Sequence, residues 1–173
     1  MKFLIFIPPK DFRDESLNAM KMFFDRWNVE YQVTSYSTKE CIGMHGATLM
    51  PDINTNKVDT SQYDGIIFVD GSGIETYKLP EFRPLLDIVL KFNNSKKYIC
   101  TVGNAVKIIA RANVIKGKKL ALPNDDEAKR VALLFHGVPS ENAMEIDDNI
   151  MTVRDSRALE ESLNPFLEHI GVK

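Results

Sequence analysis

The chain has 173 residues, of which 44% are hydrophobic and 27% charged, and its formal net charge is −2. This composition is that of an ordinary globular protein with a sizeable core, so we expect a single domain over residues 1–173. A charge so near zero leaves no electrostatic footprint for nucleic acid or an anionic membrane surface, and we expect neither as a partner.

Cysteine content and hydropathy indicate the compartment. Two cysteines, Cys41 and Cys100, are too few for a disulfide framework and lie outside CxxC spacing. No run approaches the roughly 20 apolar residues that span a bilayer. The apolar N-terminal run stops at Pro8-Pro9, which is too short for a secretion signal. We therefore expect a cytoplasmic protein with no membrane-spanning segment.

The first half of the chain alternates buried strands with an amphipathic helix. A continuous apolar run at residues 3–7 predicts a strand buried on both faces. A helix with apolar residues on one face up to Trp27 follows, and then a strand over residues 31–36. Residues 38–52 contain glycines and a proline and are predicted as a loop. A third strand, over residues 63–69, ends in a glycine-rich turn.

The second half continues this alternation. Its predicted elements are a helix after Pro84, a strand over 97–102, a helix over 104–112, a strand over 118–122, a helix over 125–136, a strand pair over 143–146 and 150–153, and a helix over 157–170. Pro165 in the last helix predicts a kink or a late start. The order predicts an α/β fold with three αβα layers, flavodoxin-like, in which helices cover both faces of a mostly parallel sheet with a late strand pair.

The turns that follow the strands hold the candidate site, because ligands of open parallel sheets bind at the carboxyl ends of strands. The strand over 97–102 runs into a sharp turn and a helix, where a nucleophile is often presented. Gly103 at this bend has no side chain to react. The turn after the third strand contains Asp70, Gly71 and Gly73, whose backbone N–H groups could face an anion or an oxyanion.

Several polar side chains are further candidates. Glu15, in the first turn of its helix, either complements the helix dipole or points its carboxylate at the Gly103 turn. His45 lies in a glycine-bearing loop, but its spacing from Glu15 and Asp70 gives no support for a metal site. We expect no metal and no cofactor. Cys100, inside an apolar strand, is expected to be an inert structural thiol.

Five segments, in order over almost the whole chain, share a pattern with a known family. They are Phe12–Glu15, Gly43–Gly46, Tyr63–Gly71, Ile115–Leu120 and Ile150–Arg154. They resemble the F-x-D-x-E, G-K-H-G, Y-D-A-hydrophobic-P-G-G, V-K-G-R-R-V and I-I-T-S-R segments of the DJ-1/PfpI family, in the class I glutamine amidotransferase-like superfamily. This resemblance implies the fold described above and a homo-oligomer, a dimer or larger.

The chain departs from the family pattern at the site that the resemblance implies. The family elbow reads A-I-C-H-G, whereas this chain has Thr101-Val102-Gly103-Asn104-Ala105. Gly103 and Asn104 therefore stand where the family has its nucleophilic cysteine and a histidine, and Asp70 replaces the first glycine of P-G-G. Glu15 and Gly71 are expected to remain from the family's site. Without a thiolate at the elbow, cysteine-dependent amidase, peptidase or glyoxalase activity is not expected.

The sequence is compatible with three functions. The first is a pseudoenzyme of uncharacterised role, related to intracellular proteases, that binds a small polar ligand or serves in assembly. The second is a hydrolase or lyase-type enzyme with Glu15 or Asp70 as general base. The third is a thiol enzyme through Cys41 or Cys100. The residues expected around the degenerate site are Gly103, Asn104 and Glu15, with Asp70, Gly71, Gly73 and His45 as candidates for the ligand pocket.

Overall fold

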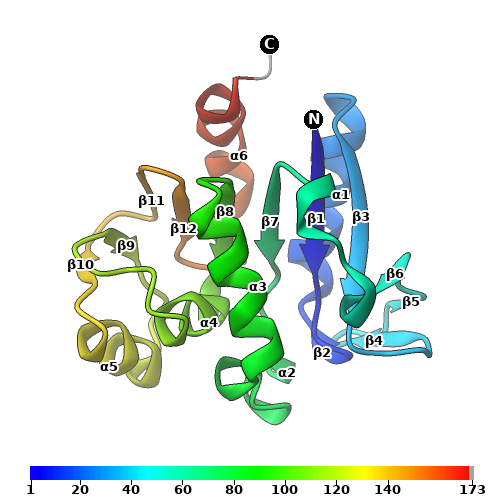
Figure 1. The fold of residues 1–173 in the computed structure, drawn as a ribbon, viewed down its shortest axis with the longest axis horizontal. Coiled ribbons are helices and arrows are strands. Elements are labelled where there is room, and N and C mark those ends of the chain that lie inside the picture. The colour runs from blue at the N-terminus through cyan, green and yellow to red at the C-terminus, as the bar shows by residue number, and fades with distance from the viewer. Residues whose placement is uncertain (172–173) are drawn as a thin grey trace.

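The computed structural model describes residues 1–171 and is built around a seven-stranded sheet (Figure 1). The order of strands across the sheet is β11-β12-β8-β7-β1-β3-β6, and only the β11–β12 pair is antiparallel. The predicted mostly parallel sheet with a late strand pair is therefore confirmed. The strands are β1 (Lys2–Phe6), β3 (Glu30–Ser35), β6 (Ile53–Asn54), β7 (Gly65–Phe68), β8 (Tyr98–Val102), β11 (Met144–Asp147) and β12 (Ile150–Val153).

Helices cover both faces of this sheet, as Figure 1 shows with α3 in front and α1 and α6 behind. One face carries α1 (Asp14–Arg26) and α6 (Ser156–Ile170), which contact each other. The opposite face carries α3 (Arg83–Asn94) and α4 (Val106–Arg111), with α5 (Asp126–Leu134) packed against α4. The short elements are α2 (Gly73–Thr76) and the 3-10 turns η1 (Thr55–Lys57), η2 (Thr60–Gln62), η3 (Leu79–Glu81) and η4 (Gly103–Ala105).

Alternate side chains of each strand fill the two cores between the layers. In β1, Leu4 and Phe6 pack on the α3 side, whereas Phe3 and Ile5 pack on the α1 and α6 side, and all four are fully buried. Successive side chains of a strand point to opposite faces. A sheet covered on both faces therefore requires the continuous apolar runs that the sequence contains.

Two small sheets lie outside the central one. One contains β2 (Lys10–Phe12), β4 (Cys41–Gly43) and β5 (Thr48–Leu49), and the other contains β9 (Lys119–Ala121) and β10 (Val138–Ser140). The prediction of a loop over residues 38–52 is therefore wrong in part. Strands of two or three residues are too short to show an alternating pattern in the sequence. In addition, β4 is held by pairing with the distant β2.

The last helix agrees with its predicted range of 157–170 to within one residue. Instead of starting late, α6 begins at Ser156, and it continues through Pro165 to Ile170. The carboxylate of Asp155 fixes its start by accepting a hydrogen bond from Ala158 N at 3.1 Å. Pro165 removes a bond to the carbonyl of Glu161, but Glu161 is exposed, so water can satisfy that carbonyl.

The carboxyl ends of the parallel strands point to the bottom of Figure 1. From β1 the chain passes to β3 on one side, and it later returns to place β7 on the other side of β1. The strand order thus reverses between β1 and β7, and such reversal points are where open α/β sheets bind ligands. Within residues 1–171 no helix is long and apolar enough to cross a membrane.

Candidate functional site

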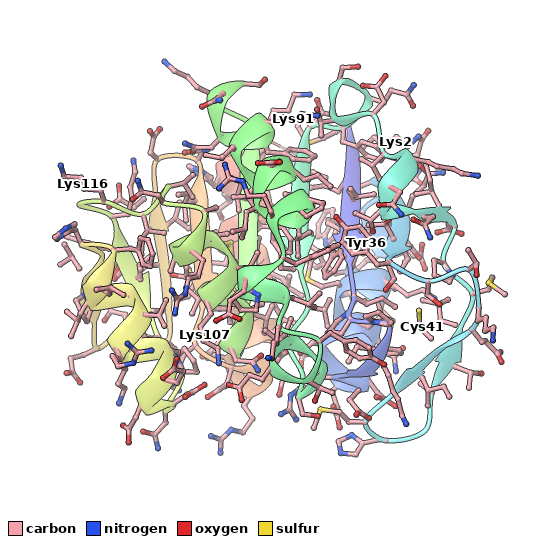
Figure 2. All side chains as sticks on the ribbon, turned by 60° about the horizontal axis from the view of Figure 1, so that its bottom comes forward. Lys2, Tyr36, Cys41, Lys91, Lys107 and Lys116 are labelled. Atoms are coloured by element: carbon pink, nitrogen blue, oxygen red, sulfur yellow. The ribbon has the colours of Figure 1, made fainter. Side chains whose placement is uncertain are left out.

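A pocket of about 600 Å³ opens at this carboxyl edge, beside the reversal point. Figure 2 turns this edge of the molecule towards the viewer. The pocket is formed by the turns after β7 and β8, the residue before α1, the β4–β5 turn and the start of α6. Its lining residues are Arg13, Met44, Asp70, Gly71, Ser72, Glu75, Gly103, Asn104, Pro123, Asp155, Ser156 and Arg157.

Gly103 lies at the bend between β8 and η4, where the sequence predicts the elbow. Its φ is +53°, a left-handed conformation that residues with a side chain rarely adopt. A Cβ atom placed on Gly103 would lie 2.8 Å from Oδ2 of Asp70 and 3.1 Å from its Cβ. The space that a side chain at the elbow would use is therefore filled by the carboxyl group of Asp70.

Asp70 is held in this position by Arg13. The Asp70 residue is 4% exposed, and its Oδ2 accepts a hydrogen bond of 3.0 Å from Arg13 Nε. A second contact joins the two backbones, because Arg13 N donates to the carbonyl of Asp70 at 2.8 Å. The Arg13 side chain is 33% exposed. The pair thus ties the β1–α1 connection to the turn after β7 and leaves part of the guanidinium facing the pocket.

The environment of Asp70 makes its carboxyl group a weaker acid than usual. Burial raises the pKa of Asp70, and the nearby Ser16 hydroxyl and Arg13 guanidinium oppose this rise without cancelling it. Among residues 1–171, neither Asp70 Oδ1 nor Ser16 Oγ has a partner in hydrogen-bond geometry. A buried carboxyl oxygen without a partner destabilises the charged form.

The Asn104 side chain already accepts a hydrogen bond from the backbone N–H of Gly71, the donor that an oxyanion site would need. Its Oδ1 accepts a hydrogen bond from Gly71 N at 3.2 Å, and its Nδ2 donates to Gly71 O at 2.9 Å. The expectation that the Gly71 N–H faces a ligand is therefore corrected, because this donor is already satisfied. Gly71 itself has a φ of +142°, and a Cβ there would lie 2.2 Å from the carbonyl oxygen of Asp11. This close approach explains why a glycine stands here.

Glu15 does not reach the pocket, which corrects a second expectation. Its Oε1 lies 2.6 Å from His45 Nδ1, and both side chains are more than half exposed, at 54% and 56%. Arg13 precedes α1 in an extended conformation, whereas Glu15 lies in the first turn of the helix, so the two side chains leave the chain in different directions. The residue beside Gly103 is therefore an arginine instead of the expected glutamate.

The structure brings together four of the predicted site residues: Gly103, Asn104, Asp70 and Gly71. It leaves Glu15, Gly73 and His45 outside the pocket lining. Gly73 starts α2 and faces the carbonyl of Lys10. His45 belongs to the β4–β5 turn, which buried Asp14 shapes by accepting hydrogen bonds from His45 N at 3.1 Å and Ala47 N at 2.9 Å.

Sequence reasoning missed several lining residues, above all Arg13. A signal for Arg13 exists: opposite charges, Arg13 and Asp70, follow two strands that a parallel sheet could place side by side. Met44 lies in a turn that Asp14 and the carbonyl of Phe12 hold by hydrogen bonds, and the start of α6 reaches the pocket through tertiary packing. These residues carry no comparable signal.

Neither cysteine lines the pocket. Cys100 in β8 and Cys41 in β4 are both buried and free. Burial raises the pKa of Cys100 to about 12, and it raises the pKa of Cys41 against the opposing effect of Ser35 and Ser37. Within residues 1–171, no three His, Cys, Asp or Glu side chains come together as a set of metal ligands.

Comparison with known proteins identifies the relatives of this fold and site. The sequence model of the DJ-1/PfpI family matches residues 1–168. An uncharacterised protein of Methanocaldococcus jannaschii is 29% identical over 153 residues, which cover 88% of this chain and 74% of that protein.

Solved structures show the same architecture. The ThiJ/PfpI domain protein of Brachyspira murdochii superposes with a TM-score of 0.91 at 20% identity, over 98% of this chain and 95% of that one. The putative protease I of Bacteroides thetaiotaomicron gives a TM-score of 0.84 at 22% identity, over 99% of each chain. DJ-1beta of Drosophila melanogaster gives 0.84 at 15% identity, over 99% of this chain and 91% of that one. With the family match spanning residues 1–168, the chain belongs to the DJ-1/PfpI family.

Proposed function

We propose that this protein is a family member that uses no cysteine nucleophile and binds a small polar ligand in the pocket above Gly103. One observation carries the proposal: the Asp70 carboxyl fills the space that a side chain at the elbow would occupy. Covalent catalysis needs an activated nucleophile at the reacting centre. In this pocket that place is taken by a carboxyl group paired with Arg13.

The surroundings of Asp70 support the same proposal. Acyl transfer needs preorganised donors for the developing oxyanion. Asn104 already occupies the Gly71 N–H, and a carboxyl group beside it disfavours an additional negative charge. The raised pKa of both buried cysteines argues against a thiolate elsewhere, because the thiolate is the reactive form.

Native alkylation tests the absence of thiol chemistry. The folded protein is treated with iodoacetamide and with dilute peroxide, and the modified positions are located by mass. We expect Cys41 and Cys100 to stay unmodified while the protein is folded and to react fully in denaturant, which is the control. Rapid, selective modification of either cysteine in the folded protein would contradict the proposal.

A second candidate function is acid–base catalysis by Asp70, favoured by the rise in its pKa on burial. Glu15, the other base considered, lies outside the pocket. The test is exchange of the protons next to the carbonyl of small ketones and aldehydes into deuterated water, followed by NMR. Catalysis would be lost in Asp70→Asn and kept in Glu15→Gln. Equal rates in wild type and Asp70→Asn would eliminate this candidate.

We also infer that the chain forms one domain, resides in the cytoplasm and self-associates into a dimer or larger assembly. The family match over residues 1–168 and the composition support the first two inferences, and the family resemblance supports the third. Light scattering tests the assembly. A mass of 19.7 kDa, that of one chain, at all concentrations would contradict self-association.

A further inference from the structure

The groups facing the pocket differ in how far they are already paired. Its three carboxylates all have cationic partners: Asp70 pairs with Arg13, Glu75 with Lys107, and Asp155 with Arg154 at 3.3 Å and Arg157 at 3.6 Å. Lys107, labelled in Figure 2, is buried on α4 and lies 3.5 Å from Asp125 as well. The acidic side chains of the pocket are thus largely neutralised from within the protein.

The hydrogen-bond donors that line the pocket, in contrast to its carboxylates, are only partly paired within the protein. Arg13 gives only Nε to Asp70, and its Nη groups make no hydrogen bond to any of residues 1–171. The hydroxyls of Ser72 and Ser156 likewise donate no hydrogen bond within that part of the chain, and the side chain of Arg157 is almost fully exposed at the mouth. What the pocket offers a ligand is therefore mainly unpaired hydrogen-bond donors on arginine and serine side chains, since its charges largely balance.

Arg13 is also the group best prepared to bind. Its backbone N–H and its side chain are both fixed on Asp70, so the outer edge of the guanidinium is held in one orientation. A planar guanidinium matches a carboxylate through two parallel hydrogen bonds. Holding it in place beforehand reduces the conformational entropy lost on binding.

We propose that the ligand of this pocket is a small carboxylate, bound through its carboxylate group by the outer edge of Arg13, with Ser72, Ser156 and Arg157 as further donors. Asp70 acts here as a positioning residue for Arg13. This inference rests on the proposed function, since it names the ligand class of the same pocket. A volume of about 600 Å³ suits a small organic acid.

The test uses the folded full chain labelled with ¹⁵N, at constant ionic strength. Lactate and succinate are the carboxylate probes, lactamide is the neutral isostere of lactate, choline is a cation, and inorganic phosphate is a different oxyanion. Binding is followed through the amide signals of Gly71, Ser72 and Gly103. We expect saturable shifts with the carboxylates and none with lactamide or choline.

Variants separate recognition from bulk charge. Arg13→Lys keeps the positive charge but loses the two parallel N–H donors of the guanidinium, and we expect it to weaken carboxylate binding roughly tenfold. Asp70→Asn should weaken binding less, by a few-fold, because Arg13 remains but is less well oriented. Arg130→Gln, on the exposed face of α5, is the matched control and should bind as wild type does. Amide signals away from the pocket check that each variant is folded.

The outcomes distinguish this inference from the proposed function. Tighter binding of phosphate than of carboxylates, or binding that is equal in Arg13→Lys and wild type, would overturn the carboxylate assignment and leave the pocket as a binding site. Binding of lactamide or choline alone would do the same. If no probe shifts the pocket amides, both the inference and the binding role are refuted.

Discussion

Two side-chain contacts, each between an acidic and a basic residue, join the start of α1 to neighbouring turns, and they differ in burial more than in distance. The Arg13–Asp70 pair spans 3.0 Å, and its carboxyl side chain is nearly inaccessible to solvent. The Glu15–His45 pair spans 2.6 Å, but both of its side chains are more than half exposed. Water and salt screen the exposed pair, so the shorter contact is expected to matter less to stability.

The comparison shows which feature organises the site. Asp70 is buried above Gly103. A change that removes its contact with Arg13 leaves a buried carboxyl group without water or a partner, which lowers the stability of the folded protein. Glu15 can exchange His45 for water at little cost. The residue that most resembles a family site acid in the sequence is thus a surface group, and the buried pair dominates the pocket.

The largest expected effect comes from adding one carbon atom beside the buried pair. Gly103→Ala places a Cβ 2.8 Å from Asp70 Oδ2 at a positive φ, and should lower the free energy of unfolding by roughly 2–4 kcal/mol. The measurement is urea denaturation. Gly117→Ala is the matched control, because Gly117 has a φ of +74° with nothing within 4 Å, and it should cost about 1 kcal/mol. Equal costs at the two positions would contradict the account.

Removal of Arg13, the cationic partner of Asp70, should have the second-largest effect on the free energy of unfolding. Arg13→Met leaves Asp70 buried and unpaired, and should cost about 2–3 kcal/mol in urea denaturation, below the range for fully buried pairs because Arg13 is partly exposed. Arg130→Met, which breaks a fully exposed pair with Glu127, should leave the free energy of unfolding nearly unchanged. A loss in Arg13→Met as small as in this control would show that the pair is solvated.

Replacement of Asn104 tests what holds the backbone turn at Gly71, next to the Arg13–Asp70 pair. Asn104→Ala removes both hydrogen bonds to Gly71, and should cost about 1–2 kcal/mol. The Gly71 amide should then exchange with deuterium faster than in the wild type, with the amides of β1 as internal controls. Unchanged protection of Gly71 would mean that Asn104 does not hold this turn.

The pH dependence of stability probes the Asp70 carboxyl directly. Its pKa in the folded protein is raised above its ordinary value of 3.8, so ionisation opposes folding. The stability that Asp70 contributes is therefore full below about pH 3.8 and is lost as pH rises through the folded pKa. The unfolding free energy of wild type minus that of Asp70→Asn should become more favourable to wild type on acidification. A change in the opposite direction would mean that Arg13 outweighs burial.

The exposed pair should give the smallest effect. Glu15→Gln and His45→Gln should each change stability by about 0.5 kcal/mol or less at low salt. In 1 M NaCl, where the Debye length is about 3 Å, even this difference should disappear, whereas the cost of Arg13→Met should persist. A larger cost for Glu15→Gln than for Arg13→Met would reverse the comparison.

Much of the fold follows from the sequence because its signals are local. The apolar runs in β1, β7 and β8 each predict a buried strand, and the bend at Gly103 follows from a strand, a glycine and a helix in succession. The short strands β4 and β5 were missed because they form only by pairing, β4 with the distant β2 and β5 with β4. Pro165 does not delay the start of α6, because a proline is tolerated in a helix where the freed carbonyl faces solvent.

The site was predictable only in part, for a different reason. Gly103, Asn104, Asp70 and Gly71 follow directly from strand ends. The directions of the Arg13 and Glu15 side chains, in contrast, depend on the residue at which the extended chain turns into α1, which sequence patterns define only to within one or two residues. The contact between Asp70 and Gly103 is a tertiary contact between the ends of two neighbouring strands, so local sequence patterns do not reveal it.

The central claim is that the Asp70 side chain occupies the space of a side chain at position 103. A double-mutant cycle between Gly103→Ala and Asp70→Gly, measured by urea denaturation, tests it most directly. With Asp70 replaced by glycine, the cost of Gly103→Ala should fall to about 1 kcal/mol, the cost of the left-handed backbone alone. If Gly103→Ala costs the same in both backgrounds, within about 0.5 kcal/mol, Asp70 does not fill that space.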